Sequence, residues 1–288
     1  MDNVIRISDG LGNQLFQYAC GYGIYRKTGR KFKLDILFLS RLRRYQLDYF
    51  RIDFSKRFVG RGLDYLIGFG PKHAKRPRRA YREYRIKKEG LKTITETAEM
   101  CFDERVWQQD QACYFTGFWQ SYQYFDAYYE EIKRQFQLKG KLSEKAKTYS
   151  EAMQNTNSVS LHIRRTDYNR ETNNVCVQEF YYKRALEQMK EKIGEIRLFV
   201  FTDDKEFVKQ NFQLQEYTLV EGVGDLEEFA LMQMCKHHII ANSTYSWWAA
   251  YLSENRGGVV FAPIAGIWKR EFYLPDWNCI ETEFIGEK

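Results

Sequence analysis

The chain has 288 residues and a formal net charge of +7, and 44% of its residues are hydrophobic. This length fits two α/β domains, and the apolar fraction supports a packed core and excludes a disordered chain. The basic balance favours anionic partners such as phosphates, nucleic acid or an anionic membrane surface. No apolar run approaches the ~20 residues of a membrane-spanning helix, and the first residues lack a signal-peptide pattern. We therefore expect a cytoplasmic location.

Cysteines and basic residues narrow the class of protein further. The six cysteines are scattered, without a CxxC pair or a Cys/His cluster at zinc spacing, so we expect reduced, mostly buried thiols. The stretch Lys72–Lys92 holds ten Lys or Arg residues against two Glu. A solvated surface is the simpler interpretation of this stretch. Peripheral contact with anionic lipid on the inner face of the membrane, or with a lipid-linked acceptor, is the alternative.

The N-terminal part begins as a strand–loop–helix–strand unit. An apolar run at 4–7 is followed by the sequence DGLGN, by a helical pattern with apolar residues on one face, and by the strand FKLD at 32–35. This order is the start of a doubly wound domain. Further on, residues 113–119 are predicted as a strand and residues 122–136 as a helix, whereas the stretch 40–90 gives no clear order of elements.

A polar stretch at 140–158 precedes the second part of the chain. We place the boundary there, with an N-terminal domain at 1–150 and a C-terminal domain at 151–288. Beyond it, strands and helices alternate, with strands predicted at 159–163, 197–202, 217–220, 238–241 and 258–262. The alternation predicts an α/β fold with a parallel sheet and helices on both faces, in which ligands bind beyond the carboxyl ends of the strands.

The first candidate motif, GLGNQ, begins at Gly10 directly after the first strand. Gly10 and Gly12 would let backbone N–H groups approach an anionic ligand at a helix N-terminus. A dinucleotide fingerprint with Asp35 as its acidic residue is an alternative, although Leu15 occupies its third glycine position. A tight turn without any ligand is a further interpretation.

The second motif, HIRRTDY at 162–168, lies at the end of a predicted strand. Because side chains alternate along a strand, His162 and Arg164 share a face and Arg165 points away. Two arginines at the mouth of a parallel sheet suit a diphosphate, since each guanidinium offers a planar fork of donors. Ion pairing with local carboxylates such as Asp167 and Glu171 is the alternative.

The third motif, FTDD at 201–204, also ends a strand. Its two carboxylates, Asp203 and Asp204, could contact a nucleotide or a metal ion. A helix N-cap with acidic residues in the first turn explains them equally well. Without further ligands in the sequence, we do not expect a metal site.

The fourth motif, NSTYSWW at 242–248, joins a predicted buried strand to an aromatic helix. Its hydroxyl groups and the helix N-terminus would form a second anion cradle. Trp247 and Trp248 are predicted to lie in the core. In the preceding helix, Glu228 could accept hydrogen bonds from a guanine, with a solvated helix face as the alternative.

Together these motifs resemble one family. The segments GLGNQLFQYA, HIRRTDY, FVFTDD and CKHHIIANSTYSWWAAYL resemble the bacterial α-1,2-fucosyltransferases of glycosyltransferase family 11, within the α-1,2/α-1,6/protein-O-fucosyltransferase superfamily. They run in the family's order over almost the whole chain. HxRRxD is shared across the superfamily, whereas GLGNQ and the NST-aromatic-SWW motif point to the α-1,2 branch. Asp9 stands where the family usually has a glycine, and Ala249 replaces another glycine.

The resemblance implies a GT-B-like fold, with two Rossmann-like doubly wound domains and the active site in the cleft between them. It implies a GDP-fucose donor bound by the C-terminal domain, and an acceptor bound by the N-terminal domain. The reaction would be an inverting transfer of L-fucose to the 2-hydroxyl of a terminal galactose, in a surface polysaccharide or a lipid-linked O-antigen glycan. No cofactor or metal would be obligatory.

The resemblance also assigns roles to the motif residues. Arg164 and Arg165 would bind the diphosphate, aided by Ser243 and Thr244, while Asn13 would lie near the reacting carbon. The full set of donor-binding candidates is Gly10, Gly12, Asn13, His162, Arg164, Arg165, Asp203, Glu228, Asn242, Ser243 and Thr244. Arg164, Asp167 and Asn13 are the catalytic candidates. Two guanidiniums would lower the pKa of Asp167 and weaken it as a base, so Glu171 and Asp9 stay open as alternatives.

Other functions remain alternatives at this point. They are a fucosyl transfer of another linkage, either α-1,6 or to protein, and a non-catalytic nucleotide- or sugar-binding protein. An NAD enzyme would explain GLGN and Asp35 but not the HIRR sequence. Nucleic-acid binding would explain the charge, but no RNP, KH or zinc-finger pattern is present, and we expect no nucleic-acid partner.

Overall fold

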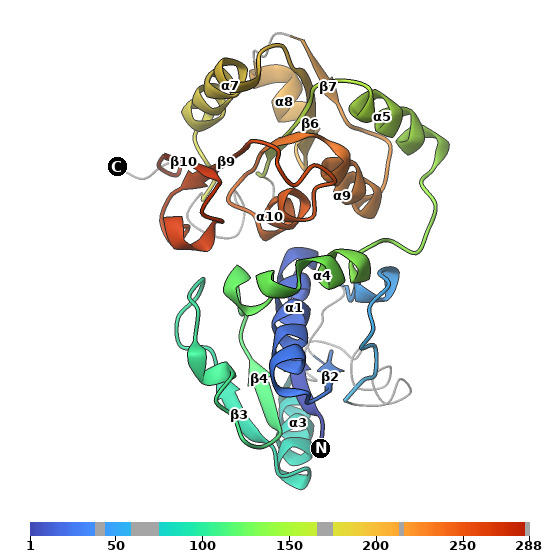
Figure 1. Ribbon diagram of the computed structural model, residues 1–288, viewed down its shortest axis with the longest axis vertical. Helices are drawn as coiled ribbons and strands as arrows, with labels where there is room; N and C mark the ends of the chain where they lie inside the picture. Colours follow the sequence, from blue (N-terminus) through green and yellow to red (C-terminus); the bar gives the residue numbers. More distant parts are fainter. Residues whose placement is uncertain (38–43, 59–74, 166–174, 213–215, 286–288) are drawn as a thin grey trace. The chain divides into compact units, whose positions relative to one another are not determined.

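The computed structural model describes residues 1–37, 44–58, 75–165, 175–212 and 216–285. It divides into two compact units, Met1–Lys139 and Gly140–Lys288 (Figure 1). Each unit is built on one parallel sheet with helices, as the α/β prediction requires. The division falls at Lys139, whereas the expected boundary after residue 150 lies inside helix α5 (Glu144–Gln154).

The sheet of the first unit has four strands in the order β2-β1-β4-β3, and all of its strand pairs are parallel. The strands are β1 (Asn3–Arg6), β2 (Phe32–Asp35), β3 (Lys92–Thr95) and β4 (Cys113–Thr116). The carboxyl ends of β1 and β4 are neighbours, because these two strands pair directly. The loops that follow them therefore begin side by side.

Helices cover both faces of this sheet. Side chains along β1 point alternately to the two faces, and those on both faces are buried. Helix α1 (Leu11–Thr28) lies against β1 and β2, with Gly21 directly over the side chain of Ile5 (Figure 1). On the opposite face, Val4 belongs to an apolar cluster onto which Tyr81 and Ile86 of α3 (Lys75–Lys88) pack. The unit also contains the 3₁₀ turns η1 (Leu47–Tyr49) and η3 (Glu104–Val106).

The segment after β4 differs from the prediction. The predicted strand 113–119 ends at Thr116, because Trp119 adopts a left-handed φ of 56° and turns the chain out of the sheet. The predicted helix 122–136 is broken into the short turns η4 (Tyr122–Tyr124) and η5 (Asp126–Tyr128) and helix α4 (Tyr129–Gln135). The break comes at Phe125, whose φ of −142° is not helical and whose ring packs on Phe16.

The second unit contains a six-stranded sheet in the order β10-β9-β8-β5-β6-β7, again parallel throughout. Its strands are β5 (Ser158–Ile163), β6 (Arg197–Thr202), β7 (Tyr217–Leu219), β8 (His237–Ile239), β9 (Val260–Ile264) and β10 (Asn278–Glu281). The helices are α5, α7 (Glu179–Ile193), α8 (Lys205–Asn211), α9 (Asp225–Met234) and α10 (Thr244–Tyr251), with the turn η6 (Arg270–Phe272). Helix α9 packs against both α10 and α5 (Figure 1).

The strand order gives the second sheet a topological switch point between β5 and β8. From β5 the chain winds outward through β6 and β7, and from β8 it winds in the opposite direction through β9 and β10. In a doubly wound sheet, the helices that follow such a pair of strands lie on opposite faces, so a crevice forms at the carboxyl ends of the strands. This is the place in a doubly wound sheet where ligands bind.

The aromatic helix α10 lies in the core, as predicted for its two tryptophans. Trp247 and Trp248 are both fully buried, and Trp247 stacks on Tyr251 with ring centroids 5.0 Å apart. The indole N–H of Trp247 donates to the carbonyl of Phe272 at 3.3 Å. These contacts fix the helix against the segment that follows β9.

All six cysteines are free thiols, and four of them are buried. This agrees with the expectation of reduced, mostly buried thiols. Among the residues that the structure describes, no helix is both long and apolar enough to cross a membrane.

Helix α1 approaches the segment after β4 closely at Gly23. A Cβ atom at this position would lie 1.9 Å from the backbone oxygen of Tyr124. We expect Gly23→Ala to lower the free energy of unfolding by ~1–3 kcal/mol, because the helix must shift away from a backbone atom. Thermal melting checks this, with Gly257→Ala as the control because a Cβ there meets no atom within 4 Å. Helix propensity alone favours alanine, so a raised melting temperature would show that the contact is absent.

Candidate functional site

Three of the predicted motifs converge at the carboxyl edge of the second sheet. β5, β6 and β8 are adjacent strands, and the motifs HIRR, FTDD and NST follow directly on them. The register pairs His162 with Phe201 and Ile163 with Thr202, so one residue further Arg164 meets Asp203. Residues that are far apart in the sequence are thereby brought into one cluster at the switch point.

His162 is the buried member of this cluster. Its side chain is 4% exposed, and its ring lies 5.8 Å from that of Tyr245. Burial and the positive charge of Arg164 lower the pKa of His162 to about 4, so the imidazole is neutral at pH 7. Among the described residues, no hydrogen-bond partner faces its Nδ1 atom. A buried, neutral imidazole with such an atom can exchange a hydrogen bond with a bound ligand.

Asp203 holds the two arginines in different ways. Its Oδ2 atom lies 3.2 Å from Nε of Arg164, and its Oδ1 atom accepts from the backbone N–H of Arg165 at 2.9 Å. The carboxylate thus joins the ends of β5 and β6. Asp203, predicted as a donor-binding residue, thus contacts both arginines directly.

Arg165 points away from Arg164, as the alternation along the strand predicts. Its guanidinium lies over the ring of Phe207 at 3.4 Å from the centroid, and its Nε atom is 3.7 Å from Oδ2 of Asp204. Asp204 also caps α8, where its Oδ1 atom accepts from the N–H of Phe207 at 3.1 Å. The FTDD carboxylates therefore act as arginine partners and as a helix cap.

Glu228, in the first turn of α9, is mostly buried and forms an ion pair with Lys205, with Oε1 and Nζ 3.4 Å apart. Burial raises the pKa of Glu228, and Lys205 works in the opposite direction. A solvated helix-face glutamate can form such an ion pair, but it would not be buried to this extent. The carboxylate is consequently placed as a hydrogen-bond acceptor at the site rather than on the outer surface.

The NST segment forms the other side of the switch point. Asn242 and Ser243 are buried, and Asn242 donates from Nδ2 to the carbonyl of Val175 at 3.0 Å. Ser243 occupies the N-cap position of α10 but makes no side-chain cap, and Thr244 is the first helical residue. The first N–H groups of α10 therefore begin next to His162, with the positive end of the helix dipole.

Sequence patterns did not identify Tyr245 and Lys205 as site residues. The Tyr245 ring contacts those of His162 and Phe229, and its hydroxyl donates to the carbonyl of Asp225. Burial and the carboxylates of Glu228 and Asp225 raise the pKa of Tyr245 well above its ordinary value. The available signal was that Tyr245 belongs to the fourth motif, NSTYSWW, where it directly follows the NST residues.

The residues predicted from the GLGNQ motif lie together in the first unit. Gly10 is the N-cap of α1, and Gly12 and Asn13 lie in the first helical turn. Asp9 has a φ of 67°, a conformation that glycine adopts freely and aspartate tolerates. This explains how Asp9 occupies a position where the family usually has glycine. The Oδ1 atom of Asp9 accepts from the N–H of Gly10 at 2.8 Å, which closes the turn.

Asp35 does not serve as the acidic residue of a dinucleotide site. It is 1% exposed, and its carboxylate accepts from the hydroxyl of Tyr114 at 2.5 Å and from the N–H of Leu37 at 3.0 Å. Burial raises its pKa. Asp35 is therefore a buried residue of the first unit, and the alternative of a dinucleotide fingerprint lacks its acidic residue.

Asp167 and Glu171, the candidates for base or ion-pair partners, lie outside the described residues. Within the described ranges, no group of three or more His, Cys, Asp or Glu side chains is placed to hold a metal ion. The positive charge at the site comes from Arg164, Arg165 and Lys205.

Comparison with known proteins agrees with the motifs. The family model "Glycosyl transferase family 11" matches residues 3–281. An Escherichia coli alpha-1,2-colitosyltransferase is 31% identical over 277 residues, which cover 90% of each chain. The E. coli O-antigen biosynthesis glycosyltransferase WbnK is 28% identical and covers 94% of this chain and 98% of its own. Mouse galactoside 2-alpha-L-fucosyltransferase Sec1 is 25% identical over 59% of this chain and 52% of its own.

Solved structures confirm the GT-B-like fold class. The fucosyltransferase NodZ from Bradyrhizobium superposes with a TM-score of 0.52 at 12% identity, covering 88% of this chain and 94% of NodZ. A family 9 glycosyl transferase from Veillonella parvula gives a TM-score of 0.51 at 10% identity, covering 100% of this chain and 89% of its own. At these identities the likeness concerns the fold alone.

The buried histidine predicts a dependence of stability on pH. The pKa of His162 is lowered to about 4 in the folded chain, against about 6.5 when unfolded. The unfolded state therefore binds a proton first as the pH falls. The stabilisation of the folded chain by the neutral imidazole of His162 is complete above pH ~6.5. It is lost toward pH 4, where the free energy of unfolding falls by about 1.4 kcal/mol per pH unit.

We expect His162→Gln to remove this slope from the free energy of unfolding between pH 6.5 and 4. Denaturant unfolding at several pH values measures it. His238 is the matched control, because burial lowers its pKa to about 3 and its Nδ1 atom bonds to Ser160 away from the motifs. His238→Gln should remove a similar slope. An unchanged slope in His162→Gln would mean that His162 is protonated in the folded chain.

Proposed function

The chain belongs to glycosyl transferase family 11, and we propose that it transfers L-fucose from GDP-β-L-fucose to the 2-hydroxyl of a terminal galactose in a glycan. The single observation that carries this proposal is the convergence of His162, Arg164 and the NST segment at the β5/β8 switch point. A nucleotide diphosphate fits this place, because it meets a guanidinium and the N-terminus of α10 together.

The guanosine half of the donor would lie between His162 and Glu228. A carboxylate accepts from both the N1–H and the exocyclic amino group of guanine, and a uracil offers no such pair of donors. Glu228 is held by Lys205, and the Nδ1 atom of His162 supplies one further polar contact. Asp203 would not contact the phosphates, because two anions repel. Its part in this proposal is to orient Arg164.

Cleavage of the fucose–phosphate bond builds negative charge on the departing β-phosphate. We assign neutralisation of this charge to Arg164, supported by Ser243, Thr244 and the first N–H groups of α10. Arg165 would maintain the local structure through Phe207 and Asp204. Deprotonation of the attacking hydroxyl is assigned to Asp167, and contact with the reacting sugar to Asn13 of the first unit. Gly10 and Gly12 would let that loop approach the donor.

No metal ion is required in this proposal, because the arginine and the helix N-terminus supply the positive charge that the leaving diphosphate needs. The galactose acceptor is supported by the name of the mouse relative, a galactoside 2-alpha-L-fucosyltransferase. The WbnK relative supports a role in O-antigen synthesis.

Colitosyl transfer is a second candidate, favoured by the 31% identity to an alpha-1,2-colitosyltransferase. Colitose is 3-deoxyfucose, so the two donors differ by one hydroxyl group on the sugar. A site that hydrogen-bonds this hydroxyl would reject the deoxy sugar strongly. The choice of donor is thus a matter of contacts to the sugar, while the nucleotide contacts would be the same.

The basic stretch is proposed as a peripheral contact with the inner face of the membrane. On α3, Arg79, Lys87 and Lys88 are exposed together with Tyr84, whereas Arg85 turns inward to the ring of Phe58 and to Glu89. An exposed basic face with an aromatic residue suits an anionic bilayer surface.

A turnover assay with galactose-terminated glycans tests the proposed function. We expect GDP-fucose to be consumed faster than GDP-colitose, with an α-1,2 linkage in the product, and EDTA to leave the rate unchanged. A faster rate with GDP-colitose would select the second candidate. A different linkage, or a loss of rate in EDTA that Mg²⁺ or Mn²⁺ restores, would contradict the corresponding part of the proposal.

The two neighbouring arginines should respond differently to substitution. Arg164→Ala should lower kcat by ~10²-fold or more, by analogy with the loss of an oxyanion donor, and Arg164→Lys should recover little of it. The chain should stay folded, because Asp203 keeps its hydrogen bond from the backbone N–H of Arg165 when the Arg164 side chain is removed. Arg165→Ala should instead lower the melting temperature, since its side chain is 15% exposed and packs on Phe207.

Steady-state kinetics and thermal melting of both variants separate these roles. Arg184→Ala serves as the control, because Arg184 is an exposed residue on α7. If Arg164→Ala melts early but turns over normally while folded, then Arg164 is structural and the phosphate role passes to Arg165.

A further inference from the structure

A loop in the first unit, residues 117–120, lies between β4 and η4 and is bound to helix α1 at both ends. Gln120 donates from Nε2 to Oδ1 of Asn13 at 2.9 Å. Gln17 donates from Nε2 to the carbonyl of Gly117 at 3.0 Å. Because Asn13 and Gln17 are four residues apart in one helix, they face the loop from the same side of α1. The loop is therefore part of the surroundings of Asn13.

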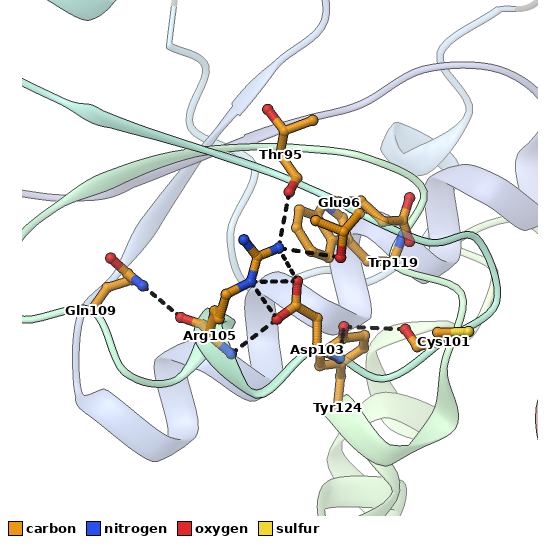
Figure 2. Close-up of polar contacts among 9 residues, drawn as sticks. Thr95, Glu96, Cys101, Asp103, Arg105, Gln109, Trp119 and Tyr124 are labelled. Atoms are coloured by element: carbon orange, nitrogen blue, oxygen red, sulfur yellow. Dashed lines mark hydrogen bonds and ion pairs between the residues drawn. The ribbon is translucent and has the colours of Figure 1, made fainter.

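Glu96, the residue that follows β3, gives this loop its shape. Its Oε2 atom accepts from the N–H of Phe118 at 2.7 Å. Its Oε1 atom accepts from the N–H of Trp119 at 2.8 Å, and Figure 2 shows both of these residues. Successive backbone N–H groups that converge on one anion form a nest. Here the anion is a side chain of the protein, and hydrogen bonds to a carboxylate are about twice as strong as neutral ones.

The loop takes a conformation that is unfavourable without this carboxylate. Trp119 has a φ of 56°, in the left-handed region that side-chain-bearing residues rarely adopt, and it is fully buried. At Gly117, a Cβ atom would lie 2.4 Å from the Cβ of Glu96. Only glycine at position 117 lets the carboxylate reach the nest. Backbone strain of this kind persists where the surroundings hold it in place.

Glu96 is itself held by the residues on each side of it. Arg105 donates to the carbonyl of Thr95 at 3.4 Å and to the hydroxyl of Thr97 at 3.3 Å (Figure 2). The guanidinium is fixed in turn by Asp103, which also caps η3. The carboxylate thus rests on a rigid support at the end of β3.

We infer that Glu96 is a positioning residue for the transfer reaction, which acts through the loop 117–120 to fix the direction of the Asn13 amide. Because Gln120 donates to Oδ1 of Asn13, the loop sets which way the carbonyl side of that amide faces. The inference rests on the proposed part of Asn13 in the reaction.

Three substitutions address this chain of contacts. Glu96→Gln replaces one accepting oxygen by an NH₂ group, so only one of the two backbone N–H groups can be satisfied. Gln120→Met keeps the size of the side chain but removes the donor to Asn13. Glu99→Gln is the matched control, because Glu99 lies exposed in the same segment and its substitution removes the same charge. We expect Glu96→Gln and Gln120→Met to lower kcat by about 10- to 100-fold, because a small misplacement of the Asn13 side chain has an effect of this size.

The decisive measurement repeats each substitution in an Asn13→Ala background. If Glu96 and Gln120 act through Asn13, they should lower kcat in the wild-type chain and leave it unchanged in the absence of Asn13. The calorimetric Kd for GDP should be the same in all variants, since the proposed nucleotide contacts lie in the second unit. Gln120→Met keeps the inference testable if Glu96→Gln does not fold.

Two results would overturn the inference in distinguishable ways. If Asn13→Ala itself turns over normally, the proposed part of Asn13 fails and the inference fails with it. If Asn13→Ala is impaired but Glu96→Gln and Gln120→Met are not, or lower kcat by the same factor in both backgrounds, only the inference fails. Equal loss in both backgrounds would show that Glu96 and Gln120 support the fold without orienting Asn13.

Discussion

The carboxylate of Asp203 is the interaction on which the candidate site depends. Parallel strands end side by side, but their backbones diverge beyond the last ladder bond, and nothing in the sheet fixes the residues that follow. Asp203 bridges this gap by binding the guanidinium of Arg164 and the N–H of Arg165. The contact directs Arg164 to one face of the sheet and Arg165 to the other. Without it, an arginine that ends a strand would be a solvated side chain with many rotamers.

Three ion pairs hold the charged side chains of the candidate site in place. Asp203, Asp204 and Glu228 each contact a cation, namely Arg164, Arg165 and Lys205. The neutral imidazole of His162 adds no charge to this balance. A diphosphate would thus contact arginine and the N-terminus of α10, while His162 stays neutral and contributes no charge to its binding.

The sequence analysis succeeded where short-range signals decide the structure. The strand 197–202 was predicted to the residue, because a run of branched and aromatic side chains that is buried from Leu198 to Thr202 marks it. The positions of HIRR, FTDD and NST at strand ends followed from the alternation of elements. By contrast, β3 was missed, since only Ile94 in it is buried and its other residues are polar. The helix predicted at 122–136 failed because periodicity cannot show that Phe125 leaves the helical conformation to pack on Phe16.

The partners within the site could not be predicted from the sequence for a similar reason. Lys205 and Glu228 are separated by 23 residues, and Glu96 and Trp119 likewise by 23, with no local pattern that links them. Their contacts arise from the strand order, which a single sequence does not contain. Asp9 lies between these two cases. The sequence shows that it replaces a glycine, but the reason, its left-handed φ, is visible only in the structure.

Calorimetric titration of the full chain with GDP, UDP and NAD⁺ tests the central claim most directly. The claim is that the β5/β8 switch point is a guanosine diphosphate site. We expect GDP to bind at least about tenfold more tightly than UDP, a difference of about 1.4 kcal/mol, and NAD⁺ to bind weakest. We also expect Glu228→Gln to reduce that preference. Equal or tighter binding of UDP or NAD⁺ would contradict the claim.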